Sequence, residues 1–139
     1  MAATGVSQMN IMGLVGCEAA YTHGREWYEA VRDYIYENIL FTKRYIDEKL
    51  PQLKMSIPEG TYLVWIDCRG LGLGKKLDRF ILEKAGLWLD DGSIFGEVGE
   101  GFERINVACP RETLKLALDK LKYAIDGLKV GERGGGKQL

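Results

Sequence analysis

The stretch from Gly99 to Thr113 reads GEGFERINVACPRET, and it decides the fold. It begins in a glycine-rich turn and continues as a short, mostly apolar run that is typical of a strand. At Pro110 the pattern changes, and an amphipathic helical pattern follows. The chain is therefore expected to pass through a strand, Phe102 to Ala108, directly into a helix.

Arg104 lies in the middle of this expected strand. Successive side chains of a strand point to opposite faces. One face would carry Phe102, Arg104 and Asn106, and the other Ile105 and Val107. A guanidinium is a planar fork of donors that suits a carboxylate or a phosphate. Arg104 is thus either a ligand-binding arginine at a domain edge or the partner of a structural carboxylate. The residues alone favour the structural role, since most arginines bind no ligand.

Composition narrows the class of protein. The chain has 139 residues, 46% of them hydrophobic, a net charge of −1 and a pI near 5.9. These values fit one domain of ordinary size and indicate no nucleic-acid or anionic-membrane partner. No apolar run approaches the ~20 residues of a membrane span. The start lacks the features of a signal peptide, so we expect a cytoplasmic protein.

The cysteines indicate free thiols. Cys17, Cys68 and Cys109 are far apart and odd in number, no C-x-x-C occurs, and the chain has one histidine. A disulfide framework or a metal site is therefore not expected.

Further elements extend outward from the central stretch. Thr61 to Asp67 (TYLVWID) is rich in β-branched and aromatic residues, which predicts a buried strand. Helical spacing of apolar residues predicts helices. The full expected order is a helix at 10–22, a long helix at 25–50, strands at 54–57 and 61–67, a helix at 76–85, a strand at 87–89, a turn-rich loop at 90–101, the strand at 102–108, a helix at 112–128 and a disordered tail at 131–139. This order predicts an α+β fold, in which helices cover a small mixed or antiparallel sheet and a long N-terminal helix links it to another domain.

The run Arg69 to Lys76 (RGLGLGKK) imitates a nucleotide-binding loop, because it lies between a strand and a helix and has three glycines and a lysine. The dinucleotide fingerprint G-x-G-x-x-G needs its third glycine one residue later. The P-loop needs a glycine where Arg69 stands and a hydroxyl where Lys76 stands. A plain strand-to-helix connection is the expected structure, with nucleotide binding as the alternative.

Three stretches carry a family resemblance: NIMGLVGCEAAYTHGREWYEAV, PEGTYLVWIDCRGLGL and DDGSIFGEVGEGFERINVACPRETL. Together they resemble the C-terminal part of fold-type-I enzymes that use pyridoxal phosphate. Within that class the chain is most similar to the class I/II aminotransferase-like carbon–sulfur lyases, the cystathionine β-lyase group of the MalY/PatB kind. The resemblance runs from about residue 5 to residue 128 in unbroken order.

The resemblance implies a role for each part of the chain. Residues 1–24 would belong to the large cofactor domain, 25–50 to the linking helix and 51–128 to the small C-terminal domain, with 129–139 as a tail. Arg104 would bind the α-carboxylate of an amino-acid substrate. The loop Gly92 to Gly96 would approach the active site, with Ser93, Phe95 and Gly60 on its rim.

The resemblance also implies what this chain lacks. The cofactor lysine of the family lies in a Ser-X-X-Lys motif, and no such spacing occurs here. We therefore expect part of a longer pyridoxal-phosphate enzyme, inactive and without bound cofactor by itself. The glycine-containing apolar segment 10–22 suggests a homodimer or a swapped oligomer. Three alternatives stay open: an aminotransferase as the parent, a stand-alone amino-acid-binding or regulatory module, and the nucleotide-binding domain.

Overall fold

The computed structural model describes residues 10–134, with side chains up to residue 128. These residues divide into two compact units between Tyr34 and Ile35, inside the long helix α2 (Arg25–Lys49). Residues 1–9, the first part of the segment expected to belong to the large cofactor domain, lie outside the described residues, as does the end of the expected tail. The last helix, α4 (Arg111–Gly134), extends into the segment expected as a tail and ends at residue 134.

The first unit contains α1 (Ile11–His23) and the first turns of α2. The Asn10 side chain caps α1 by accepting a hydrogen bond from the Gly13 amide at 2.7 Å, as is common at helix N-termini. Gly24 joins the two helices. A Cβ at this position would lie 2.4 Å from the Ala20 carbonyl oxygen, so glycine is required at this joint. No side chain of α1 is buried.

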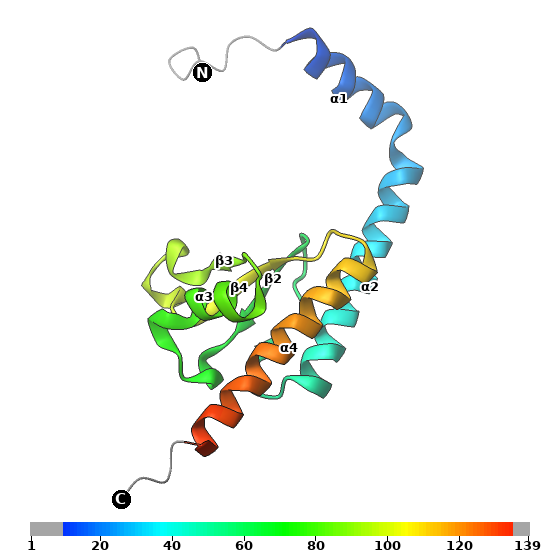
Figure 1. The fold of residues 1–139 in the computed structure, drawn as a ribbon. Helices are drawn as coiled ribbons and strands as arrows, with labels where there is room; N and C mark the ends of the chain where they lie inside the picture. Colours follow the sequence, from blue (N-terminus) through cyan, green and yellow to red (C-terminus); the bar gives the residue numbers. More distant parts are fainter. Residues whose placement is uncertain (1–9, 135–139) are drawn as a thin grey trace, which may run out of the picture. The chain divides into compact units, whose positions relative to one another are not determined.

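The second unit is built on a four-stranded antiparallel sheet in the order β1-β2-β4-β3 (Figure 1). The strands are β1 (Lys54–Met55), β2 (Leu63–Asp67), β3 (Asp90–Asp91) and β4 (Phe102–Asn106). The prediction of a helix-covered α+β fold is confirmed.

One predicted strand was wrong: Leu87 to Leu89 form no strand, and β3 lies directly after them. Pairing with β4 places Asp90 opposite Arg104 and Asp91 opposite Glu103. Leu87 and Leu89 instead pack on the core as partly buried side chains. Pairing with β4, and not apolar character, therefore determines where β3 lies.

Helices cover the inner face of the sheet. Figure 1 shows α4 beside the C-terminal half of α2, and Tyr45 of α2 donates a hydrogen bond to Asp119 of α4 at 2.6 Å. The predicted apolar stripe of α4 is confirmed as a buried face. The core joins residues of both helices and the sheet, among them Ile46, Leu50, Val64, Ile66, Ile105, Val107, Leu114, Leu118, Leu121 and Ile125.

The predicted helix 76–85 is irregular. It begins as α3 (Leu77–Phe80) and continues as a π-helical turn over Ile81–Ala85. Gly86 ends the turn with a φ of +61°, a left-handed conformation that favours glycine. This turn packs against α4 and contributes Ile81 to the core.

A buried amide fixes α2 to the segment after β4. Asn38 is fully buried, and its Nδ2 donates to the carbonyls of Val107 and Cys109, each at 2.8 Å. Its Oδ1 accepts from Arg111 Nε at 2.6 Å. Each of these bonds crosses more than 60 residues of sequence, so Asn38 holds the end of β4 and the start of α4 against α2.

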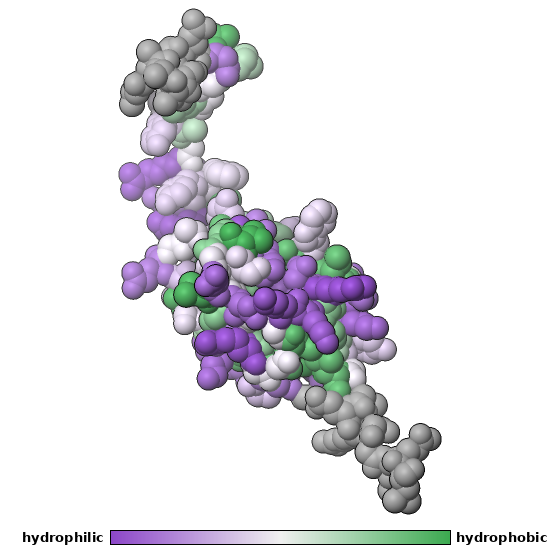
Figure 2. Space-filling model, turned by 90° about the vertical axis from the view of Figure 1, so that its left-hand side faces the viewer, coloured by the Kyte–Doolittle hydropathy of each residue, from purple (hydrophilic) through white to green (hydrophobic). Residues whose placement is uncertain are grey.

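Charged and polar side chains cover much of the face that Figure 2 displays, with apolar patches between them. Within residues 10–134, no helix combines the length and apolar character that crossing a bilayer requires.

Candidate functional site

Aromatic side chains gather with Arg104 on the outer face of the sheet. Trp65 of β2 is the cross-strand partner of Arg104, so the two side chains share a face. The Trp65 ring contacts Phe95 edge to face, with centroids 5.3 Å apart, and lies 6.3 Å from Phe102. The predicted alternation of β4 is confirmed, because Ile105 and Val107 are buried on the inner face. We call Trp65, Phe95, Phe102 and Arg104 the outer-face cluster.

The guanidinium of Arg104 is held on two sides. Its Nε and Nη2 donate to one oxygen of Asp90, Oδ2, at 3.1 and 2.8 Å. Its Cζ lies 4.4 Å from the Phe95 ring centroid, within the range of a cation–π contact. The Arg104 side chain keeps 24% of its surface exposed. Asp90 is thus the carboxylate partner that the structural interpretation of Arg104 required.

The bond pattern still leaves Arg104 able to bind a ligand. A guanidinium has five N–H groups, and Asp90 takes one from Nε and one from Nη2. Of the other three, one on Nη1 and one on Nη2 form the end-on edge of the fork, and the second N–H of Nη1 lies on the opposite side edge. The end-on edge can bind a second carboxylate through two parallel hydrogen bonds. A structural pair and a ligand role are therefore compatible in this geometry.

Close backbone packing fixes the loop that carries Phe95. Gly92 and Gly99 face each other, and a Cβ added at Gly92 would lie 2.2 Å from the Gly99 carbonyl oxygen. A Cβ at Gly99 would lie 2.0 Å from the Gly92 oxygen. Only glycine permits this approach, so the two ends of the loop stay together and Phe95 stays over Arg104.

The other two predicted rim residues are placed differently. Ser93 is bound to Asp91, through its amide at 2.9 Å and its hydroxyl at 2.6 Å, and it lines a separate cavity. Gly60 is an exposed turn residue between β1 and β2, with open space where a Cβ would be. Of the three proposed rim residues, Phe95 is the one with a contact to Arg104 among the described residues.

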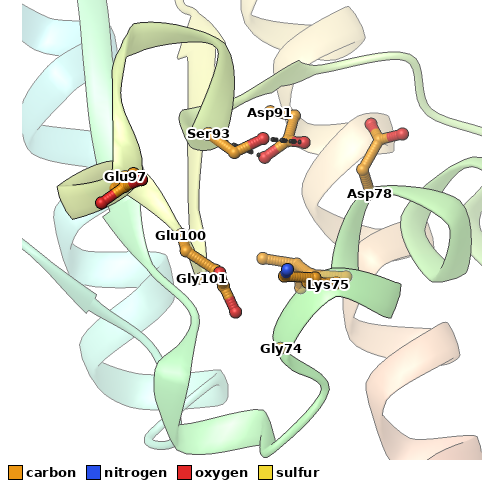
Figure 3. Close-up of a pocket in the computed structure, with 9 residues that line it drawn as sticks. Gly74, Lys75, Asp78, Asp91, Ser93, Glu97, Glu100 and Gly101 are labelled. Carbon is orange, nitrogen blue, oxygen red and sulfur yellow. Dashed lines mark hydrogen bonds between the residues drawn. The ribbon is translucent and has the colours of Figure 1, made fainter.

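The separate cavity has a volume of about 420 Å³ and is acidic. Figure 3 shows Asp78, Asp91, Glu97 and Glu100 around it, with Lys75 of the RGLGLGKK run between them. Four carboxylates around one lysine repel a phosphate group. The same run forms two short 3₁₀ turns, at Arg69–Leu71 and Gly74–Lys76. The acidic cavity and the short turns favour a simple strand-to-helix connection for this run over a nucleotide-binding loop.

Glu103 is a functional candidate that the sequence interpretation missed. Its side chain is 1% exposed, and neither carboxylate oxygen has a hydrogen-bond partner. Burial, followed by the nearby charges of Asp78, Asp91 and Asp90, raises its pKa from 4.5 to about 7. The alternation of the strand could have predicted this burial, because it places Glu103 on the same inner face as Ile105 and Val107.

The thiols lie in different surroundings. Cys68 is buried, and this burial, with the charges of Glu103 and Asp67, raises its pKa to about 12. Cys109 is half-buried, which also raises its pKa, and Cys17 is exposed. A thiol is nucleophilic as its thiolate, so Cys68 is inert at neutral pH. The described part of the chain has no cluster of residues arranged to bind a metal.

No family model matches the chain, but individual proteins do. Cystathionine β-lyase PatB of Bacillus subtilis is 33% identical over 122 residues, which cover 87% of this chain and 32% of that protein. Protein MalY of Escherichia coli is 32% identical, over 90% of this chain and 32% of its own length. The chain thus spans about a third of the length of these curated relatives.

Solved structures agree with these matches. A pyridoxal-phosphate-bound putative aminotransferase from Clostridium difficile matches with a TM-score of 0.85 and 41% identity, over 89% of this chain and 32% of that one. Cystalysin from Treponema denticola, which contains pyridoxal 5'-phosphate, matches with a TM-score of 0.84 and 35% identity, over the same shares.

The fold and the matches together define a class: the chain corresponds to about a third of a fold-type-I pyridoxal-phosphate enzyme and has the fold of the C-terminal domain of these enzymes. Within that class its sequence matches the MalY/PatB cystathionine β-lyases and the related aminotransferases.

Proposed function

We propose that this chain is the small C-terminal domain of a pyridoxal-phosphate carbon–sulfur lyase of the cystathionine β-lyase kind. In this proposal Arg104 binds the α-carboxylate of the amino-acid substrate. The observation that carries it is the guanidinium fork of Arg104, whose end-on edge has two N–H groups, one on Nη1 and one on Nη2, without a bond to the described residues. An amino acid is the substrate class because a carboxylate matches that edge in shape and charge.

The acidic cavity does not fit the cofactor itself. Lys75 is the lysine of the acidic cavity, and the four carboxylates around it oppose a phosphate group. The sequence also has no Ser-X-X-Lys spacing. We therefore assign the cofactor, its lysine and its phosphate contacts to a part of the parent enzyme outside these 139 residues. The contribution of this chain is to bind and orient the substrate.

The outer-face cluster supports a second contribution. Phe95 covers one face of the Arg104 guanidinium and keeps water from that face, and Trp65 packs edge to face against Phe95 and Phe102. A charged hydrogen bond is stronger where water is excluded. A carboxylate bound to the end-on edge would therefore be held more tightly and in a narrower range of orientations.

The test is an assay of the pyridoxal-phosphate enzyme that carries this domain. Release of pyruvate from L-cystathionine, without any 2-oxo-acid acceptor, is expected of a lyase. The alternative is an aminotransferase. It is favoured by matches to an aspartate aminotransferase, at 32% identity, and to a probable N-acetyl-LL-diaminopimelate aminotransferase, at 31% identity. Amino-group transfer to 2-oxoglutarate without release of pyruvate would establish that alternative.

A homodimer is a further part of the proposal. The first unit exposes large apolar side chains, including Ile11, Met12, Leu14 and Val15. Exposed apolar surface of this kind favours association with another chain. Light scattering at increasing concentration measures it, and a monomer throughout would contradict it.

A further inference from the structure

We propose that Asp90 is a positioning residue: its carboxylate fixes the side edge of the Arg104 guanidinium so that the end-on edge faces the substrate carboxylate. This inference rests on the proposed role of Arg104 and adds a residue that acts through it. Asp90 itself touches no substrate in this arrangement.

The first argument concerns which N–H groups of Arg104 donate to Asp90. Nε and Nη2 lie on the same edge of a guanidinium, and both donate to Asp90 Oδ2. Binding through this edge fixes the rotation of the group about its long axis. It also leaves the Nη1 and Nη2 pair, the geometry that matches a carboxylate with two hydrogen bonds. If Asp90 bound the end-on edge instead, it would occupy the position that we assign to the substrate carboxylate.

The second argument is how firmly Asp90 is placed. Asp90 lies in β3, directly opposite Arg104 in the antiparallel pairing with β4. The sheet backbone therefore sets the distance between the two side chains. Phe95 covers the guanidinium face at 4.4 Å, so Asp90 fixes the in-plane orientation and Phe95 limits tilting. Asp90 Oδ1 makes none of the bonds to Arg104, so the pair uses one oxygen and leaves the other toward solvent on a side chain that is 47% exposed.

The third argument concerns charge. Asp90 neutralises Arg104, and this by itself would weaken attraction for a substrate carboxylate. A positioning role and a charge-blocking role therefore predict different results when Asp90 is replaced. Asp90→Asn and Asp90→Ala both remove the charge, but only asparagine keeps an oxygen that can accept from Nε and Nη2. Comparing these two variants cancels the charge effect and isolates the position of the acceptor.

The experiment uses the 139-residue chain with L-alanine as the probe and L-alaninamide, which lacks the carboxylate, as its control. Nuclear magnetic resonance gives the Kd for the probe and the solvent-exchange rate of the Arg104 Nε–H group. We expect the Kd for L-alanine to be at least about fivefold higher in Asp90→Ala than in Asp90→Asn. We also expect Nε–H exchange at least tenfold faster in Asp90→Ala than in wild type, with Asp90→Asn between them.

Equal L-alanine affinities in the two variants would overturn the inference, as would equal Nε–H exchange in wild type and Asp90→Ala. If the affinity of the chain is too low to measure, the same comparison is made on kcat/KM of the parent enzyme, and the exchange measurement shows whether Asp90 holds the side edge of the fork. Melting temperatures of both variants show whether β3 still folds, and a purely structural role of Asp90 would change them without separating the L-alanine affinities of the two variants. Arg104→Ala tests the underlying proposal separately: unchanged L-alanine binding there would refute the substrate role of Arg104, whatever the Asp90 variants show.

Discussion

Replacing Glu103 by glutamine should stabilise the domain at neutral and alkaline pH and leave it unchanged near pH 4. Glu103 is buried without a hydrogen-bond partner, and burial raises its pKa from 4.5 to about 7. The folded state therefore holds a proton on this carboxyl that the unfolded chain releases more easily. Glutamine has nearly the same shape and stays neutral at every pH.

The sign follows from the direction of the pKa change. Below pH 4.5 the carboxyl is protonated in both states, so its ionisation costs no stability. As the pH rises from 4.5 to 7, the unfolded chain loses the proton first and the folded state becomes relatively less stable. Above pH 7 the carboxylate is charged in both states, and the full penalty is present. At 1.36 kcal/mol for each pH unit between the two pKa values, that penalty is about 3 kcal/mol.

The assay is urea denaturation of wild type and Glu103→Gln at several pH values from 4 to 8. The difference in unfolding free energy should grow from near zero at pH 4 to about 2–3 kcal/mol at pH 8 in favour of the variant. Glu59→Gln is the matched control, because Glu59 is exposed in a turn of the same unit. A difference that does not change with pH, or a variant less stable than wild type at pH 8, would refute the reasoning.

Three other perturbations test the site and the core. Arg104→Ala should lower kcat/KM of the parent enzyme by roughly 30-fold to several thousand-fold. The reason is that removing one partner of a buried charged pair, here Arg104 and the substrate carboxylate, costs about 2–5 kcal/mol. Arg104→Lys should restore part of this, and a variant that melts early but turns over normally would assign Arg104 a structural role alone. Asn38→Ala should cost about 2–4 kcal/mol of stability by urea denaturation, because three hydrogen bonds lose a buried partner; a loss no larger than that of exposed Glu37→Ala would contradict this. Borohydride reduction of the chain with pyridoxal phosphate should give scattered, substoichiometric lysine labelling by peptide mapping, and stoichiometric labelling of one lysine would show a cofactor site here.

Local patterns were sufficient for much of the second unit. The alternation of β4 predicted that Arg104 lies on the face opposite to Ile105 and Val107, because a strand has a side-chain period of two whatever it pairs with. The apolar stripe of α4 predicted its buried face for the same kind of reason, since helical periodicity is local. Arg104 could therefore be singled out, with a carboxylate named as its partner type.

Tertiary structure decided which partners these residues have. The strand expected at Leu87 to Leu89 lies at Asp90–Asp91, because pairing with β4 supplies its hydrogen bonds, and this pairing places Asp90 beside Arg104. Ser93 was expected near the same arginine, but its amide and its hydroxyl donate hydrogen bonds to the side chain of Asp91, two residues earlier in the loop. The sequence by itself determined which face each side chain of a strand occupies. Only the packing of segments far apart in the chain decided that Glu103 would be buried without a partner and that Arg104 would keep one edge of its fork open.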